Sequence, residues 1–135
     1  MTSYLADLEL SSSTLSLAEI AAVVGHPPGP ASHDLGDPRP RGRVWEASIW
    51  RLSSAAGDEA SLAQHLSELR SRAEKRGLLD SRDLPGDLRR VLRVAAKHDT
   101  FTITVQLPAA SLLPFLAAGF DLEISAYPVD EEPRE

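Results

Sequence analysis

The sequence predicts an α+β fold of the ferredoxin-like type, a split-βαβ sandwich whose four-stranded, mainly antiparallel sheet carries helices on one face. Two observations support this prediction. Segments with strand and helix patterns alternate along the chain, and a helical insert separates two β-α-β halves. The strand segments also alternate apolar and polar residues, which is typical of a sheet with one face on a core and the other in water.

The first half begins with a strand over residues 4–12. Its apolar residues fall on one face, and the acidic residues Asp7 and Glu9 fall on the other. A helix follows over residues 14–25, where Ser16 and Glu19 have the spacing of a capping box and Gly25 supplies a left-handed stop. A second strand is predicted over residues 44–54.

The helical insert between the two halves begins with the longest helix, over residues 58–77, and continues with an ambiguous segment over residues 88–96. We favour a helix for this segment because of its apolar spacing, although Val91 to Val94 also fits a short strand. Alternation then predicts a strand over residues 100–107, a short helix over residues 111–119 and a final strand over residues 120–127. The inner face of the final strand is expected to carry Phe120, Leu122, Ile124 and Ala126.

The length of 135 residues indicates a single α+β domain, assigned to residues 1–127, followed by an acidic, flexible tail over residues 128–135. The chain contains no cysteine, which excludes disulfides, thiolate zinc sites and thiol nucleophiles. No apolar run approaches the roughly 20 residues that a membrane span needs, and the N-terminus lacks the pattern of a secretory signal. We therefore expect a cytoplasmic protein that does not associate with membranes.

The net charge of −6 argues against broad nucleic-acid binding, because such binding depends on neutralising phosphates. The outward positions of the strand over residues 100–107 carry Thr and Gln, whereas RNA-binding sheets present stacking aromatics there. The sequence also contains no nucleophile elbow, P-loop or dinucleotide-binding motif. We therefore assign no catalytic residue and no cofactor, and we favour a role other than catalysis.

The loop over residues 26–43 is rich in proline and glycine, and it is long for a compact domain. It contains His33 and Asp37, which are weak candidates for a metal site because their spacing fits no zinc pattern. Solvated turn residues are the favoured interpretation of both. Arg41 and Arg43 are candidates to bind a phosphate or a carboxylate. A solvated strand entrance is the more common role of such a run.

Polar residues on the outward face of the predicted sheet form the main candidate site. The first, third and last strands are neighbours in a ferredoxin-like sheet, so their outward side chains would make an acidic surface for a basic partner. An ordinary solvated face is the alternative. Trp50 would add a binding anchor if its ring were half-exposed, and core packing is the more common outcome. The other candidate residues on this surface are Asp7, Glu9, Thr102, Thr104, Asp121 and Glu123.

The order of these features resembles the uncharacterised bacterial domain-of-unknown-function family four-two-seven-nine. The resemblance rests on SLAEIAAVVGHPP in the first helix, the Gly36-Asp37 pair in the loop, the strand WRLSS, the helix LAQHLSELRSRAE and the closing LAAGFDLEISAY. It covers about Tyr4 to Tyr127, and the proline-rich loop departs from it in carrying more Arg and Pro. The family has no established activity, so the resemblance implies no catalytic or binding residues.

These observations favour a small bacterial binding module that acts through protein–protein interaction, with toxin neutralisation in the manner of immunity proteins as one such role. The alternative is a small-molecule sensor or enzyme in which the 26–43 loop forms a lid over a pocket lined by Trp50, His33 and Arg43. Self-association of the open sheet, including a homodimer, is a third interpretation.

Overall fold

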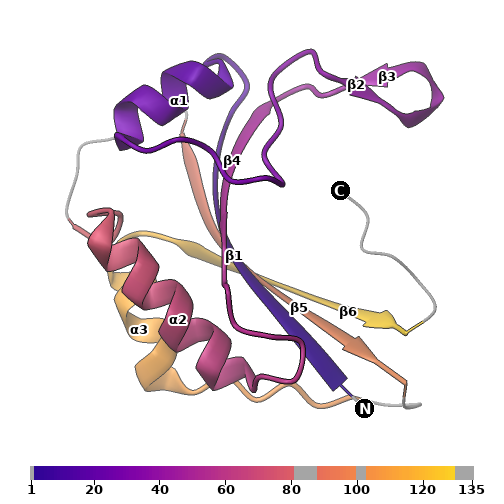
Figure 1. The fold of residues 1–135 in the computed structure, drawn as a ribbon, viewed down its shortest axis with the longest axis vertical. Coiled ribbons are helices and arrows are strands. Elements are labelled where there is room, and N and C mark those ends of the chain that lie inside the picture. Colours follow the sequence, from indigo (N-terminus) through magenta and orange to yellow (C-terminus); the bar gives the residue numbers. More distant parts are fainter. Residues whose placement is uncertain (1, 81–87, 100–102, 130–135) are drawn as a thin grey trace.

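The computed structural model describes residues 2–80, 88–99 and 103–129, and Figure 1 shows how they are arranged. A four-stranded sheet runs through the molecule, and helices lie on one side of it. The strands of this sheet are β1 (Thr2–Ser12), β4 (Ser48–Ser53), β5 (Arg89–His98) and β6 (Asp121–Pro128). The helices are α1 (Leu17–Val24), α2 (Leu62–Lys75) and α3 (Ala109–Ala117). The prediction of the α+β class is confirmed.

The strand order β4-β1-β5-β6 places β1 and β5 in the interior of the sheet. β1 pairs antiparallel with both β4 and β5, whereas β5 and β6 are parallel. The parallel pair needs a crossover, which α3 supplies between β5 and β6. The sheet is therefore mixed, and the prediction of a mainly antiparallel sheet is wrong. The ferredoxin-like split-βαβ arrangement is not confirmed.

Residues 88–96, for which the sequence favours a helix, contain most of β5. The run from Val91 to Ala96 is buried throughout, so residues on both faces of β5 are buried there. A strand that is buried on both faces carries apolar residues on both rather than in alternation, and in this run only Arg93 is polar. That run also fits a helical stripe, which is why periodicity could not separate the two structures.

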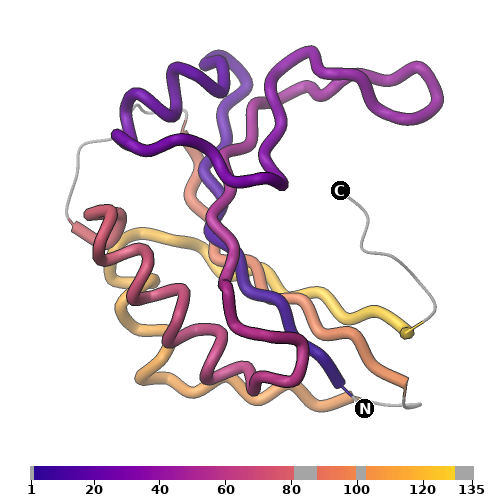
Figure 2. Tube along the Cα trace, in the orientation of Figure 1, coloured from indigo at the N-terminus to yellow at the C-terminus, as the bar shows by residue number. Residues whose placement is uncertain are grey.

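The third strand was expected over residues 100–107, and the described part of that segment, residues 103–107, does not take part in the sheet. Residues 103–107 have no strand pairing and connect β5 to α3, as the tube in Figure 2 shows, and residues 100–102 lie outside the described part of the chain. Val105 and Leu107 are half-buried and pack against the core. The alternation of these apolar residues with polar residues therefore reflects a connecting segment with one side packed against the core. In the sheet, β5 occupies the position that was expected for the third strand.

The core lies between the sheet and the helices. α2 crosses β1, and α3 packs mainly against α2 (Figure 1). α1 begins at the capping box expected from the sequence, where Ser16 and Glu19 exchange hydrogen bonds of 3.1 Å, and it ends at Gly25 with a φ of 81°. Among the described helices, none has the length and apolar character needed to cross a lipid bilayer.

The segment expected as a loop over residues 26–43 contains a small hairpin. Its parts are β2 (Pro38–Arg39), the 3-10 turn η1 (Pro40–Gly42) and β3 (Arg43–Val44), with β2 and β3 paired antiparallel. This hairpin projects from the body of the molecule at the upper right of Figure 1. We use the name arm for residues 34–46, which include the hairpin and the residues on either side of it. Of the tail expected over residues 128–135, Pro128 is the last residue of β6, and residues 130–135 lie outside the described residues.

Candidate binding surface

Asp7 and Glu9 lie on the sheet face opposite the helices, and arginines neutralise both. Asp7 is opposite Arg93 of β5, and Glu9 is opposite Arg51 of β4. Arg93 Nη2 lies 3.1 Å from Asp7 Oδ2, and Arg51 Nε lies 2.8 Å from Glu9 Oε1. Directly opposite residues of antiparallel strands have side chains within contact distance, so the strand register creates these pairs. The expectation of a uniformly acidic face therefore needs correction.

These four side chains form a buried charged cluster. Asp7 is 2% exposed and Arg51 is 3% exposed, and Arg93 Nη1 lies 3.6 Å from Glu9 Oε1, so the cluster is continuous. Asp7 Oδ1 is buried and has no hydrogen-bond partner among the described residues. Arg93 was missed because the helix favoured for residues 88–96 removed it from the sheet, and Arg51 was missed because the pairing of β1 with β4 was not predicted. The cluster leaves neither carboxylate available to a basic partner.

The β4 edge of the sheet is covered by residues 29–33, which run beside it. His33 N–H donates to the Ile49 carbonyl at 2.9 Å, and Ile49 N–H returns a bond of 2.8 Å to His33. Gly29 N–H donates to the Arg51 carbonyl at 3.1 Å, and Arg51 Nη1 donates to Ala31 O at 3.0 Å. This first part of the expected loop is thus fixed as an edge cover, which protects β4 from pairing with another strand.

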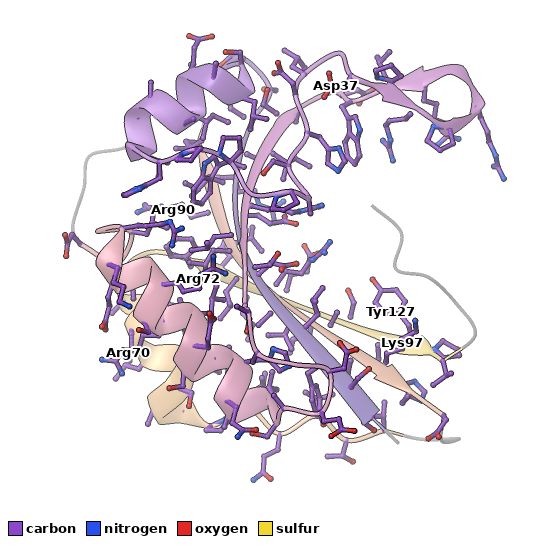
Figure 3. The ribbon with its side chains drawn as sticks, in the orientation of Figure 1. Asp37, Arg70, Arg72, Arg90, Lys97 and Tyr127 are labelled. Carbon is purple, nitrogen blue, oxygen red and sulfur yellow. The ribbon has the colours of Figure 1, made fainter. Side chains whose placement is uncertain are left out.

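Asp34 holds the base of the arm against the body. Its Oδ1 accepts hydrogen bonds from Leu17 N–H at 2.9 Å, from Leu35 N–H at 2.9 Å and from Ser48 Oγ at 3.1 Å. The bond from the first residue of α1 is the main cause that lowers the pKa of Asp34 below its ordinary value. Asp37, labelled in Figure 3, accepts from Asp34 N–H at 2.9 Å. The aspartates in this loop therefore fix the backbone.

Ring contacts account for Trp45 and Arg39 of the arm and for His33 beside it. The His33 ring stacks on Trp45 with centroids 3.9 Å apart, and the Arg39 guanidinium lies 4.2 Å from the Trp45 ring centroid. Arg41 and Arg43 are exposed. Within the described ranges, no group of three or more His, Cys, Asp or Glu could hold a metal ion.

Three of the four further sequence candidates are described, and these three lie apart from one another. Trp50 is 1% exposed and lies in the core, where its Nε1 donates to the His26 carbonyl at 3.3 Å, so its ring is no surface anchor. Arg43 lies on the arm, and the structure does not bring it together with Trp50 into the pocket that the lid interpretation needs. Thr104 is exposed in the connection before α3, and Thr102 lies outside the described residues.

β6 forms the opposite edge of the sheet, and it is exposed on both faces. Phe120 is buried, but Leu122 and Ile124, expected on the inner face, are 36% and 48% exposed. The reason is the position of the helices, because α2 crosses β1 and α3 packs on α2, which leaves β6 uncovered. α3 itself exposes Leu113 at 64% and Leu116 at 44%. Apolar side chains thus lie on a strand whose outer backbone edge has no partner among the described residues.

Charged and polar side chains occupy the other face of β6. Asp121 and Glu123 are exposed and make no ion pair with the residues that the structure describes. Tyr127 follows on the same face, opposite Lys97 of β5, and Figure 3 shows these two side chains at one end of the sheet. We use the name β6 edge for the surface made by the outer backbone of β6 and the side chains of Asp121, Leu122, Glu123 and Ile124.

Comparison of the chain with protein-family models, with curated proteins and with solved structures found no match. The resemblance to the bacterial family named above therefore stays a prediction. The case for a binding surface comes from the geometry of the chain alone.

The sequence pointed to Asp121 and Glu123 but not to the apolar part of the β6 edge. Period-two alternation tells which residues share a face of a strand, and it does not tell which face a helix covers.

Proposed function

We propose that this chain is a protein-binding module that pairs an extended segment of a partner protein with the β6 edge. One observation carries the proposal: Ile124 is 48% exposed in an eight-residue edge strand whose outer backbone groups have no partner among the described residues. Edge-strand addition combines backbone hydrogen bonds with contacts from alternate side chains, and β6 offers both.

The asymmetry between the two edges of the sheet supports this role. Residues 29–33 cover β4, and Lys, Pro and bulges are the other usual protections of an exposed edge. β6 contains no lysine, and its proline is the last residue, Pro128. Asp121 and Glu123 are its only charged residues, and a basic partner segment would neutralise the protection that these two charges give the edge.

The side chains of β6 define the chemistry of the partner segment. On one face, the carboxylates of Asp121 and Glu123, which form no ion pair within the described part of the chain, favour basic side chains opposite them. On the other face, Leu122 and Ile124 favour apolar side chains. The fitting segment is therefore an extended peptide in which Lys or Arg alternates with apolar residues, and the charged contacts make its affinity fall with rising salt.

Selection from a displayed library of random peptides tests this function. We expect the enriched peptides to alternate basic and apolar residues and to lose binding to an Ile124→Lys variant. Ala63→Lys, an exposed substitution on α2, is the matched control and should bind as the unchanged chain does. Selection against the double variant Asp121→Lys with Glu123→Lys should enrich acidic residues instead.

The proposal fails if the enriched peptides bind the Ile124→Lys variant as well as the control. It also fails if charge reversal at positions 121 and 123 leaves the selected sequences unchanged, because the peptides would then occupy another surface.

A further inference from the structure

We infer that the β6 edge also pairs with a second copy of this chain, antiparallel and with a two-fold axis at Ile124, so that the homodimer and the partner-bound form exclude each other. The exclusion rests on the proposed function, since both forms use the same edge. The pairing itself rests on the residue order of β6 and on its exposure.

Symmetry restricts how β6 can pair with its own copy. Directly opposite residues in an antiparallel pair point to the same face of the sheet. A two-fold axis perpendicular to the sheet keeps each face on its own side, so it must pass next to a residue of β6 rather than between two residues. The choice is therefore among axes at single residues near the middle of the strand.

The charges of β6 favour the axis at Ile124. An axis at Glu123 would place its carboxylate against the same carboxylate of the copy, and like charges directly opposite one another are unfavourable. An axis at Ser125 would place Leu122 against Pro128, which has no N–H to donate. The axis at Ile124 avoids both problems.

The Ile124 axis also gives each face of β6 a fitting partner. Asp121 then lies opposite Tyr127 of the copy, and Glu123 lies opposite Ser125, so each carboxylate faces a residue with a hydroxyl. On the helix side, Ile124 meets Ile124, and Leu122 meets Ala126. Two four-stranded sheets would join into one, and the exposed fractions of Leu122 and Ile124 would fall.

Salt separates the two occupants of the edge. Each copy carries a net charge of −6, and the homodimer brings no cation of β6 against its carboxylates. Screening therefore strengthens the homodimer, whereas it weakens the binding of a basic segment. The homodimer and the complex with a basic segment should therefore respond to salt in opposite directions, whatever the affinity of either.

Single cysteines test the register directly, because the chain has none of its own. In this pairing, Ile124→Cys places two sulfurs at positions whose Cα atoms lie about 4.5–5.5 Å apart, within the range of a disulfide. For Glu123→Cys and Ser125→Cys, the strand spacing puts the Cα atoms roughly 8 Å apart, beyond that range. Ala63→Cys on α2 reports random collisions.

We expect mild oxidation to trap a covalent dimer with Ile124→Cys and to trap much less with the other three variants. Sedimentation of the full chain should show a concentration-dependent dimer that strengthens with salt. Ile124→Lys should weaken this association about tenfold or more, while Ala63→Lys leaves it unchanged. Circular dichroism of both lysine variants checks that they are folded.

A chain that stays monomeric and is not trapped through Ile124→Cys overturns the inference. Preferred trapping through position 123 or 125, or equal trapping through position 63, overturns it as well. If basic peptides still require Ile124 in these cases, the proposed function stands without the homodimer. If a homodimer forms and no peptide binds the β6 edge, the proposed function fails and the self-pairing stands.

Discussion

At the scale of single residues, the buried cluster on the open face decides which charges this molecule can offer to others. Asp7, Glu9, Arg51 and Arg93 come from three different strands, and their charges cancel within the cluster. Burial of an ion pair costs desolvation of both groups, so such a pair contributes little net stability but is costly to break. Asp7 and Arg93 are therefore expected to matter for folding and not for binding.

Replacement of Asp7 tests this expectation. Asp7→Ala leaves the Arg93 guanidinium buried, with only Glu9 at 3.6 Å, and we expect a loss of about 3 kcal/mol in the free energy of unfolding. Urea denaturation measures this loss. Glu74→Ala is the control, because it breaks the exposed pair with Arg70, whose side chains are 53% and 49% exposed, and should cost less than about 0.5 kcal/mol. A similar small cost for both variants would contradict the role of the cluster.

Asp34 makes the stability of the arm depend on pH. Its folded-state pKa is lowered, first by the hydrogen bond from Leu17 N–H, so its ionised form is favoured in the folded chain. This contribution is fully present above the ordinary value of 3.8 and is lost as the pH falls through the lower folded-state pKa. Asp34 therefore stabilises the junction of the arm, α1 and β4 at neutral pH and not in strong acid.

Melting temperatures recorded across this range test the assignment. Asp34→Asn removes the ionisable group, so the variant should melt below the unchanged chain at neutral pH, and the difference should shrink in acid below pH 3.8. Asp58→Asn, an exposed substitution before α2, is the control and should give no such trend. A difference that stays constant down to strong acid would assign the effect to something other than ionisation.

At the scale of elements, residues 29–33 explain why only one edge of the sheet is open. Gly29 lies so close to β4 that a Cβ at this position would be 2.5 Å from the Arg51 carbonyl oxygen. Only glycine allows this approach, and the approach aligns the hydrogen bonds that follow at His33 and Ile49. The segment is thus an edge cover whose packing against β4 depends on the absence of a side chain at Gly29.

Gly29→Ala should displace this cover from β4. We expect a loss of about 1–3 kcal/mol, the usual cost of forcing an extra carbon into a packed contact, together with faster amide hydrogen exchange at His33 and Ile49. NMR-detected exchange measures both amides. Gly57→Ala is the matched control, since a Cβ there meets nothing within 4 Å. Unchanged exchange at both amides in Gly29→Ala would show that the cover tolerates the side chain.

At the scale of the whole molecule, stability should decrease from the centre of the sheet towards β6. β1 is paired on both sides, and its residues Ala6, Leu8 and Leu10 are in the core, whereas β6 is paired on one side and exposed on both faces. Local opening free energies follow such differences in burial and pairing. The candidate binding edge is therefore also the most easily opened strand of the sheet.

Hydrogen exchange of the full chain tests this gradient. The slowest amides should lie in residues 6–10 and 91–96, and those of β6 should exchange faster by about a hundredfold or more. Protection of β6 should rise with protein concentration, as the inferred homodimer requires. A β6 as protected as β1 in dilute protein would contradict the gradient.

What the sequence determined by itself is local. The capping box and the Gly25 stop of α1, the faces of β1 and the α+β class follow from local spacings, and the structure shows them as expected, although α1 begins at Leu17 rather than at residue 14. Neighbours in the sheet were decided by tertiary structure. Residues 88–96 contain most of a strand that pairs with β1 on one side and with β6 on the other. Residues 103–107 form no strand, because β5 occupies the position beside β1 that was expected for them.

For the candidate site, too, some features could be predicted from the sequence and others depended on the tertiary structure. The exposed carboxylates of Asp121 and Glu123 could be found from alternation, whereas the neutralisation of Asp7 and Glu9 depended on registers with β5 and β4. The exposure of Ile124 depended on where α2 and α3 packed. Alternation fixes which side chains share a face, but the partners that cover or neutralise that face come from segments far away in the chain, and only the packed fold brings them there.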